Sequence, residues 1–280
     1  MTPSDQDPWL LTPGPLTTSA ATKEAMLHDW GSRDAAFIET NRRVLERLLA
    51  IAGAGESHVC VPLQGSGTFT VEATLGTLIG GNDKALVLIN GAYGHRMAKI
   101  LDYAGRAHAI LETPEDTPPD LDALEAALKA EAEITHVVCV YCETTSGILN
   151  PVADIARIAA ECGKSLLIDA MSAFGALPLD AAEISFDAVM ASSNKCLEGV
   201  PGMGFAIIRR SALEACQGNA HSLSLDLYEQ WTAIEANGQW RFTPPTHVIC
   251  AFDAALVQFE AEGGVEARHR RYQANGKILI

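Results

Sequence analysis

The sequence lacks several features that mark particular classes of protein. No run of 18 consecutive apolar residues occurs, so we expect no transmembrane helix. The first residues, MTPSDQDPWLLTPGP, start acidic and contain neither a basic region nor a long apolar region, so we expect no signal peptide. Basic residues are scarce, since 20 Lys and Arg stand against 35 Asp and Glu and leave a formal net charge of −15. This balance argues against a nucleic-acid surface and against an anionic membrane partner.

Cysteine is odd in number and scattered along the chain. The seven positions are Cys60, Cys139, Cys142, Cys162, Cys196, Cys216 and Cys250. We interpret them as reduced thiols of a cytoplasmic protein rather than as a disulfide framework. Cys139 and Cys142 form a CxxC pair inside THVVCVYCE, a predicted strand in which positions three apart point to opposite faces. No second CxxC completes a zinc site, so we expect core cysteines and no metal.

Strand-like and helix-like segments alternate along most of the 280 residues, of which 48% are hydrophobic. Short apolar runs predict strands at 58–63, 84–90, 106–112, 134–141, 165–170, 186–192 and 204–209. Helical spacing of apolar residues predicts helices at 34–53, 68–80, 92–105, 120–132 and 151–163. Asp34 is the expected N-cap of the first helix, Gly53 its stop, and Pro151 the first helical residue of the last. From Ser211 onward the chain is expected to be mostly helical.

This alternation predicts an α/β fold with a mainly parallel sheet that helices cover on both faces. The length of the chain favours one large domain with a smaller appendage. In sheets of this kind, ligands bind beyond the carboxyl ends of the strands. The residues that directly follow each strand are therefore the first candidates for a functional site.

Glycines and hydroxyls follow the first predicted strand, in the segment Gln64-Gly65-Ser66-Gly67-Thr68. Free N–H groups at the start of the next helix, together with the hydroxyls of Ser66 and Thr68, are suited to holding a phosphate. The segment is not a Walker loop, because no lysine follows, and it is not GxGxxG, because the third glycine is missing. An ordinary strand-to-helix turn explains the pattern too, and both interpretations stay open.

Asp169 and Tyr93 follow two other strands. Asp169 ends the apolar SLLI run, where a carboxylate is costly to bury without a partner. It is either a cap or loop acceptor, or the partner of a cation or of a protonated ring nitrogen. Tyr93, in NGAYG, is either a core tyrosine or a face on which a flat ring stacks.

Lys195 lies in SSNKCLEGVPGMG, between a predicted buried strand and a turn rich in Gly and Pro. A solvent-exposed lysine is the ordinary alternative, but its neighbours are small and apolar. A desolvated lysine has a lowered pKa and becomes a nucleophile suited to Schiff-base chemistry. A phosphate cradle, an acid for a ring nitrogen, an aromatic face and a lysine amine together match the needs of pyridoxal 5′-phosphate.

The sequence resembles the class V aminotransferases, which depend on pyridoxal phosphate and share the aspartate aminotransferase fold. Six segments carry the resemblance in family order: LLTPGPLTT, QGSGTFTVEA, NGAYGHR, CETTSGILNP, IDAMSAFGA and SSNKCLEGVPGMGF. It covers nearly the whole chain and implies a fold type I α/β domain with a mainly parallel seven-stranded sheet. The implied division is an N-terminal segment lining the site (1–20), a large cofactor-binding domain (21–245) and the helical start of a small domain (246–280). The rest of that small C-terminal domain is expected to be missing here.

The resemblance also implies roles for individual residues. Lys195 would form the Schiff base and move a proton between substrate and cofactor, while Asp169 would keep the pyridine nitrogen protonated. The other cofactor contacts would come from Ser66, Gly67, Thr68 and Asn194 at the phosphate, Tyr93 at the ring and Thr144 at the ring hydroxyl. Thr243 would reach the phosphate of a second subunit in a homodimer, and Gly14 would line the substrate entrance.

The implied reaction is a transamination in two halves. 2-Aminoethylphosphonate gives its amine to the cofactor and leaves as phosphonoacetaldehyde, and pyruvate takes the amine and leaves as L-alanine. The family's substrate-binding arginine has no counterpart in this sequence, which leaves Arg33, Arg96 and Arg241 near the implied site and Arg33 as the candidate for the substrate anion. Three alternatives stay open: a lyase on a hydroxylated aminoethylphosphonate, another class V aminotransferase of the alanine–glyoxylate type, and an inactive protomer that only binds the cofactor.

Overall fold

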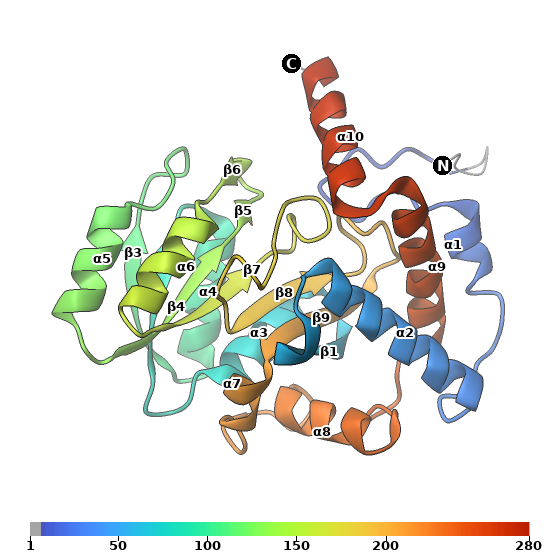
Figure 1. The fold of residues 1–280 in the computed structure, drawn as a ribbon, viewed down its shortest axis with the longest axis horizontal. Helices are drawn as coiled ribbons and strands as arrows, with labels where there is room; N and C mark the ends of the chain where they lie inside the picture. The colour runs from blue at the N-terminus through green and yellow to red at the C-terminus, as the bar shows by residue number, and fades with distance from the viewer. Residues whose placement is uncertain (1–6, 280) are drawn as a thin grey trace.

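A seven-stranded sheet forms the centre of the protein in a computed structural model that describes residues 7–279 (Figure 1). Its strands are β1 (His58–Gly65), β2 (Lys84–Ile89), β3 (Ala107–Glu112), β4 (Ile134–Val140), β7 (Ser165–Asp169), β8 (Ala188–Ser192) and β9 (Gly202–Arg209). The order across the sheet is β1-β9-β8-β7-β4-β2-β3, and only β9 runs antiparallel to its neighbours. The predicted mainly parallel seven-stranded sheet is confirmed. β9 departs from it because residues 193–201, which join it to β8, are too few for a crossover helix.

Helices cover both faces of the sheet. One apolar core includes α2 (Ala35–Ile51), α5 (Leu121–Ala130), α6 (Val152–Glu161) and α9 (Thr246–Glu262). The other includes α3 (Gly67–Leu78), α4 (Ala92–Tyr103), α7 (Arg210–Glu214) and α8 (Leu227–Asn237). The remaining elements are α1 (Ala20–Glu24), the 3-10 turn η1 (Gly55–Ser57), α10 (Gly264–Leu279) and a hairpin of β5 (Cys142–Glu143) and β6 (Ile148–Leu149). The far end of α10 projects from the body of the molecule (Figure 1).

The helix ends lie close to the predicted positions. Asp34 is the N-cap residue of α2, and Gly53 follows its end with a φ of +57°, a conformation that glycine adopts without strain. Asp120 caps α5, because its side chain accepts a hydrogen bond from the Ala123 N–H at 3.0 Å. Pro151 is the N-cap residue of α6 rather than its first helical residue, so this helix begins one position later than predicted.

Cys139 and Cys142 do not share a strand, which corrects the sequence prediction. β4 ends at Val140, and Cys142 begins the β5–β6 hairpin, which was not predicted. Gly147 closes this hairpin, since its N–H donates to the Glu143 carbonyl at 2.7 Å and its φ of +79° permits the tight turn. Cys139 is buried, but Cys142 is only half-buried and lines the pocket described below. All seven cysteines are free thiols.

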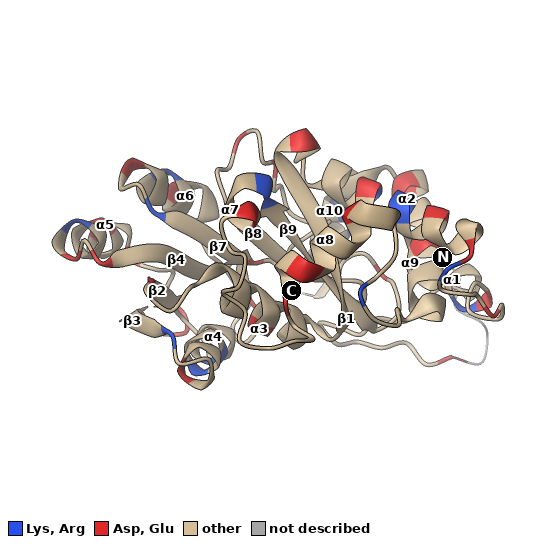
Figure 2. Ribbon diagram, turned by 90° about the horizontal axis from the view of Figure 1, so that it is seen from below, with Lys and Arg blue, Asp and Glu red and all other residues tan. Residues whose placement is uncertain are grey.

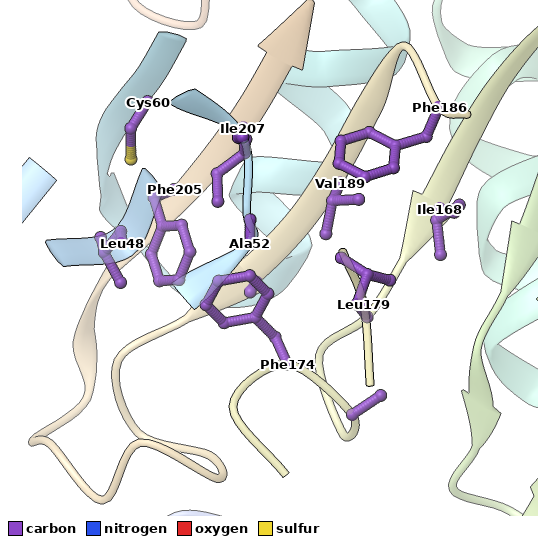
Figure 3. Packing of buried hydrophobic residues seen from close by; sticks show 14 of the residues in the cluster. Leu48, Ala52, Cys60, Ile168, Phe174, Leu179, Phe186, Val189, Phe205 and Ile207 are labelled. Carbon is purple, nitrogen blue, oxygen red and sulfur yellow. The ribbon is translucent and has the colours of Figure 1, made fainter. Parts of the chain in front are cut away.

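The central strands are apolar along most of their length because both of their faces are buried. Along β9, Phe205 and Ile207 face one core, and Ala206 between them faces the other. Figure 3 shows the first of these cores, in which Phe205 and Phe174 lie with their ring centroids 5.3 Å apart. The Phe205 ring also stacks at 6.1 Å on Phe252 of α9. α9 therefore packs into the same core as the sheet.

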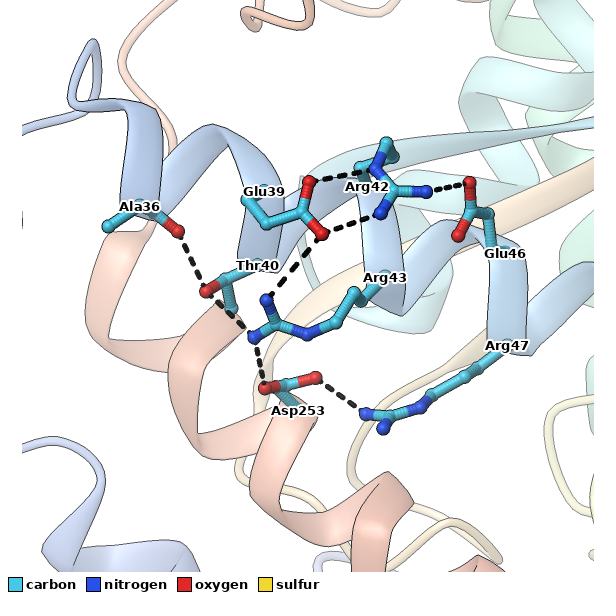
Figure 4. Close-up of polar contacts among 8 residues, drawn as sticks. All are labelled: Ala36, Glu39, Thr40, Arg42, Arg43, Glu46, Arg47 and Asp253. Atoms are coloured by element: carbon cyan, nitrogen blue, oxygen red, sulfur yellow. Dashed lines mark hydrogen bonds and ion pairs between the residues drawn. The ribbon is translucent and has the colours of Figure 1, made fainter.

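Charged residues lie mainly on the helices, while the strands carry few (Figure 2). Asp253 of α9 joins two arginines of α2, accepting from Arg43 at 2.9 Å and from Arg47 at 2.7 Å (Figure 4). These ion pairs add to the apolar contacts that fix α9 on α2. α9 begins at Thr246, and the division into a large domain (21–245) and the start of a small domain (246–280) stays a prediction. Within residues 7–279, no helix is both long and apolar enough to cross a membrane.

Candidate active site

A pocket lies at the carboxyl ends of the parallel strands, where the strand pattern predicts a site. Its wall is formed by Ser66, Gly67, Thr68, Val71, Tyr93, Arg96, Met97, Val140, Cys142, Thr144, Asp169, Met171, Ser172, Ser192, Asn194 and Lys195. The last residues of β4, β7 and β8 belong to this wall. The structure therefore brings together all of the predicted cofactor contacts except Thr243.

Lys195 is half-buried in the turn that follows β8. Its Nζ donates a hydrogen bond to the Gly14 carbonyl at 3.3 Å, which places the N-terminal segment against the lysine. Burial lowers the pKa of the Lys195 ammonium, against the opposing effects of Cys196 and Asp169. A neutral, nucleophilic amine is thus more accessible here than on an ordinary surface lysine, as the sequence argument requires.

The turn that carries Lys195 is held by its own backbone and by one hydroxyl. The N–H of Glu198 donates to the Lys195 carbonyl at 2.8 Å, and the N–H of Gly199 donates to the Ser193 carbonyl at 2.8 Å. The buried Ser193 hydroxyl donates to the Val200 carbonyl at 2.6 Å. The small polar residues beside the lysine therefore build the turn that aims it.

Asp169 ends β7 and is buried, with 3% of its surface exposed. Burial raises the pKa of its carboxyl to about 6, and the nearby Glu143 adds to the rise, whereas Arg96 and Lys195 oppose it. One carboxylate oxygen accepts from the Met171 N–H at 3.0 Å. The carboxyl is therefore a loop acceptor, and among residues 7–279 no Lys, Arg or His forms an ion pair with it to offset its burial.

The segment that is predicted to bind a phosphate joins the end of β1 to the start of α3. Ser66 is the N-cap residue, and its side chain makes no capping hydrogen bond, so the first N–H groups of the helix stay available to an anion. Ser192, at the end of β8, adds a buried hydroxyl that has no hydrogen-bond partner among residues 7–279. Such an unsatisfied hydroxyl in a pocket wall is suited to a polar ligand.

Arg96 and Tyr93 form another part of the wall, on α4. The Arg96 guanidinium lies over the Tyr93 ring, 4.6 Å from its centroid. It also donates to the Thr68 hydroxyl at 3.4 Å. Arg96 therefore places a positive charge beside the start of α3. The sequence predicted no role for Arg96 beyond its place near the implied site, although its spacing of three from Tyr93 puts both residues on one helix face.

The β5–β6 hairpin supplies residues that the sequence analysis missed. The buried Glu143 carboxylate accepts from the Tyr93 N–H at 3.3 Å and from the Thr145 N–H at 3.2 Å. Thr144, a predicted site residue, shares a hydrogen bond of 2.7 Å with the Ser172 hydroxyl. Glu143 follows an apolar strand as Asp169 does, and that shared pattern was the available sequence signal.

Three predicted residues lie outside the wall of the pocket. Gly14 is next to it, since its carbonyl accepts from Lys195. Arg33 and Thr243 are exposed at other positions. Arg241 binds the Leu223 carbonyl at 2.7 Å and does not line the pocket either. The roles expected for Arg33 and Thr243 remain predictions.

The residues present fit pyridoxal 5′-phosphate. An acid without a cation, an amine with a lowered pKa, a helix N-terminus and an unsatisfied hydroxyl converge on one pocket. These groups would meet the ring nitrogen, the aldehyde and the phosphate of that cofactor.

Known proteins resemble this chain over almost its full length. The chain is 55% identical over 273 residues to the 2-aminoethylphosphonate–pyruvate transaminase of Pseudomonas fluorescens (strain Pf0-1), covering 98% of this chain and 74% of that relative. It is 53% identical over 280 residues to the transaminase of the same name from Pseudomonas aeruginosa, covering 100% of this chain and 76% of the relative.

Solved structures share the fold. The alanine–glyoxylate aminotransferase of Nostoc sp. matches with a TM-score of 0.91 at 23% identity, over 100% of this chain and 75% of that one. The pyridoxamine–pyruvate aminotransferase of Mesorhizobium loti matches with a TM-score of 0.86 at 26% identity, over 96% and 69%. Residues 16–279 match the family described as aminotransferase class-V. The predicted fold is thus confirmed, and this chain belongs to the class V aminotransferase family.

Proposed function

We propose that this chain transfers the amino group of 2-aminoethylphosphonate to pyruvate, producing phosphonoacetaldehyde and L-alanine. The substrates are those for which relatives that are 53–56% identical are named. Family membership supports pyridoxal 5′-phosphate as the cofactor. The observation that carries the proposal is the pairing, in one pocket wall, of half-buried Lys195 with fully buried Asp169. The relatives' names favour this reaction over a lyase or an alanine–glyoxylate exchange.

When bound, pyridoxal 5′-phosphate supplies an electron-withdrawing ring that stabilises the negative charge left on a substrate carbon after proton loss. Asp169 would hold the proton on the ring nitrogen, because a buried carboxylate is stabilised by a neighbouring cation. Ser66, Gly67 and Thr68 would hold the phosphate at the start of α3. Tyr93 would lie against the ring, and the remaining contacts would come from Thr144 and Asn194.

Lys195 would hold the cofactor covalently until the substrate amine takes its place, and the amine so released would act as the base. In its neutral form Nζ carries a free electron pair, which can accept the proton from the amine-bearing carbon of the substrate. The lowered pKa of Lys195 makes that neutral form more available. Its hydrogen bond to Gly14 keeps the amine near the N-terminal segment, at the proposed substrate entrance.

Arg96 would support the phosphate. Its guanidinium is within 3.4 Å of Thr68, in the predicted phosphate cradle. A guanidinium pairs well with phosphate oxygens, and stacking on Tyr93 limits the conformations it must lose on binding.

We further propose a homodimer in the cytoplasm. Arg33 and Thr243 are exposed and outside the pocket wall, so we assign them to the pocket of a second subunit, Thr243 at the phosphate and Arg33 at the substrate anion. Seven free thiols fit a reducing compartment.

The test follows the cofactor and one product, L-alanine. The purified chain is supplied with pyridoxal phosphate, and its absorbance is recorded before and after 2-aminoethylphosphonate is added. Pyruvate is then added and L-alanine is measured. We expect the spectrum to change with the amine alone and alanine to form only when both substrates are present. Turnover that continues without any keto acid would show a lyase instead. An unchanged spectrum would favour the alternative of a protomer that is inactive.

A further inference from the structure

An arginine far along the chain contacts the turn that carries Lys195. Arg268, in α10, is completely buried. Its guanidinium donates to the carbonyl of Cys196, the residue that directly follows Lys195. The same guanidinium lies over the ring of Phe259 of α9, 5.1 Å from the centroid. α10 therefore reaches back onto the peptide next to the proposed catalytic lysine.

Arg268 belongs to a charge-balanced cluster of two arginines and two glutamates. It pairs with Glu262 at 2.7 Å and with Glu198 at 3.6 Å. Arg271 pairs with the same two carboxylates, at 2.7 Å and 2.8 Å. Because the formal charges of the two arginines and two glutamates cancel, the cluster adds no net charge beside the pocket.

Glu198 adds an unusual backbone conformation to this cluster. Its φ of +56° makes it the one non-glycine residue with positive φ among residues 7–279. A left-handed conformation at such a residue costs free energy and persists only where the surroundings impose it. The cluster holds the Glu198 side chain, and the Arg268 guanidinium holds the carbonyl two residues earlier. The shape of the turn is thus fixed from outside it.

We propose that Arg268 is a positioning residue for Lys195, which it keeps in place through the Cys196 carbonyl. The proposal rests on the proposed function, in which Lys195 is the base. A buried ion pair is weak evidence for stability, because apolar side chains of similar volume often stabilise a fold as well. A planar guanidinium, however, holds its donors in one rigid fork, so that Nε binds Glu262 while Nη1 binds the Cys196 carbonyl. The donors of an ammonium rotate about a single nitrogen and fix no such geometry.

The experiment separates positioning from simple stabilisation. Four variants are compared with the wild-type chain: Arg268→Met, Arg268→Lys, the double variant Arg268→Met/Glu198→Gln, and the control Arg270→Met. Arg270 lies on the same helix and is largely exposed, and its one ion pair within the described residues is with Glu266, at 3.6 Å. The double variant removes the carboxylate charge that loss of Arg268 would leave unpaired.

Three quantities are measured on each variant. They are the midpoint of thermal unfolding, the rate at which borohydride-fixed cofactor accumulates on Lys195 per folded chain, and hydrogen exchange at the Glu198 and Gly199 amides. The last needs no cofactor, because it reports the hydrogen bonds inside the turn. If the wild-type chain fixed no cofactor on Lys195, the proposed function would fail, while the exchange data would still decide whether Arg268 holds the turn.

We expect Arg268→Met to lower the midpoint, to speed exchange in the turn and to slow cofactor fixation by about 10-fold to 100-fold, the loss typical of a displacement near 1 Å. The double variant should recover the midpoint but neither of the other two quantities, and Arg268→Lys should stay below wild type in fixation. Arg270→Met should match wild type throughout. Recovery of all three quantities in the double variant, or wild-type exchange and fixation in Arg268→Met, would overturn the proposal.

Discussion

Lys195 and Asp169 are ionisable side chains that the fold removes from water. Burial raises the pKa of the Asp169 carboxyl to about 6 and lowers that of the Lys195 ammonium, so each group is biased toward its neutral form. A neutral amine is reactive, and a buried carboxyl without a cation attracts a protonated ring nitrogen. The same burial that prepares the site therefore costs stability as long as the cofactor is absent.

Asp169→Asn should stabilise the cofactor-free chain and abolish transamination. The carboxyl has a pKa of about 6 in the fold against an ordinary 3.8, so the folded chain binds more protons between these values. Stability is therefore lost as pH rises through this window, by roughly 2–3 kcal/mol in total. Asn keeps an acceptor for the Met171 N–H and removes that loss. Thermal unfolding should show a higher midpoint than wild type at pH 8 and a smaller gain at pH 5.

The control for this measurement is Asp102→Asn. Asp102 lies on α4 with 70% of its side chain exposed, so its replacement should give no comparable gain at pH 8. An Asp169→Asn midpoint at or below wild type at both pH values would show that burial does not penalise this carboxylate.

Gly14→Ala should displace the lysine. A Cβ at Gly14 would lie 2.6 Å from the Cδ atom and 3.0 Å from Nζ of Lys195, and the φ of +147° is one that other residues rarely adopt. We expect borohydride-fixed cofactor on Lys195 to form about tenfold more slowly or worse. Gly147→Ala is the matched control, because Gly147 also has a positive φ, of +79°, but its added Cβ would meet no atom within 4 Å. Equal rates of cofactor fixation in the two variants would contradict the prediction that a side chain at position 14 displaces Lys195.

At the scale of elements, the β5–β6 hairpin fixes the start of α4. The N-cap residue of α4 is Gly91, which has no side chain to accept from the first N–H groups. The side chains of Glu143 and Thr145 accept these hydrogen bonds instead. The Ala92 N–H donates to the Thr145 hydroxyl at 3.2 Å, and the Tyr93 N–H donates to the Glu143 carboxylate at 3.3 Å. The cap comes from a hairpin of two short strands, whose pattern was too brief to predict from sequence.

Glu143→Ala should destabilise the chain and loosen the start of α4. The substitution removes the acceptor of the half-buried Tyr93 N–H and of the Thr145 N–H, at a cost of roughly 0.5–1.5 kcal/mol for each hydrogen bond. Glu143→Gln keeps one oxygen acceptor and should lose less. Chemical unfolding measures the free energies, and hydrogen exchange at Tyr93 reports the helix end. Glu125→Ala, at a side chain 40% exposed on α5, serves as the control. Identical stabilities for Glu143→Ala and wild type would exclude the capping role.

At the scale of the whole molecule, local sequence pattern predicts the elements but not the long-range contacts. The strand ends identify Ser66, Asp169 and Lys195, because parallel topology brings carboxyl ends to one edge. The same pattern cannot reveal Arg268, whose segment RHRRYQ has the composition of a solvated charged face. Its partner carbonyl is 72 positions away. Nor does a net charge of −15 show that Arg96 places positive charge in the pocket.

The shared active site of the proposed homodimer gives the last prediction. If Thr243 of one subunit reaches the cofactor phosphate of the other, a chain with Lys195→Ala and a chain with Thr243→Val fail for different reasons. In a mixed dimer, the Thr243→Val subunit keeps its own lysine and receives an intact Thr243 from the Lys195→Ala subunit. One of its two sites is then complete. Random mixing of equal amounts makes half of all dimers mixed, which restores about one quarter of the wild-type sites.

The measurement uses limiting cofactor, because loss of one hydrogen bond to a charged phosphate weakens binding by roughly tenfold or more. The two variants are unfolded and refolded together, and alanine formation is compared with that of each variant refolded alone. Activity near one quarter of wild type, above the mean of the two separate samples, is the expected result. Activity equal to that mean would show that each pocket is built within a single subunit, and Thr243 would then have no part in the neighbouring site.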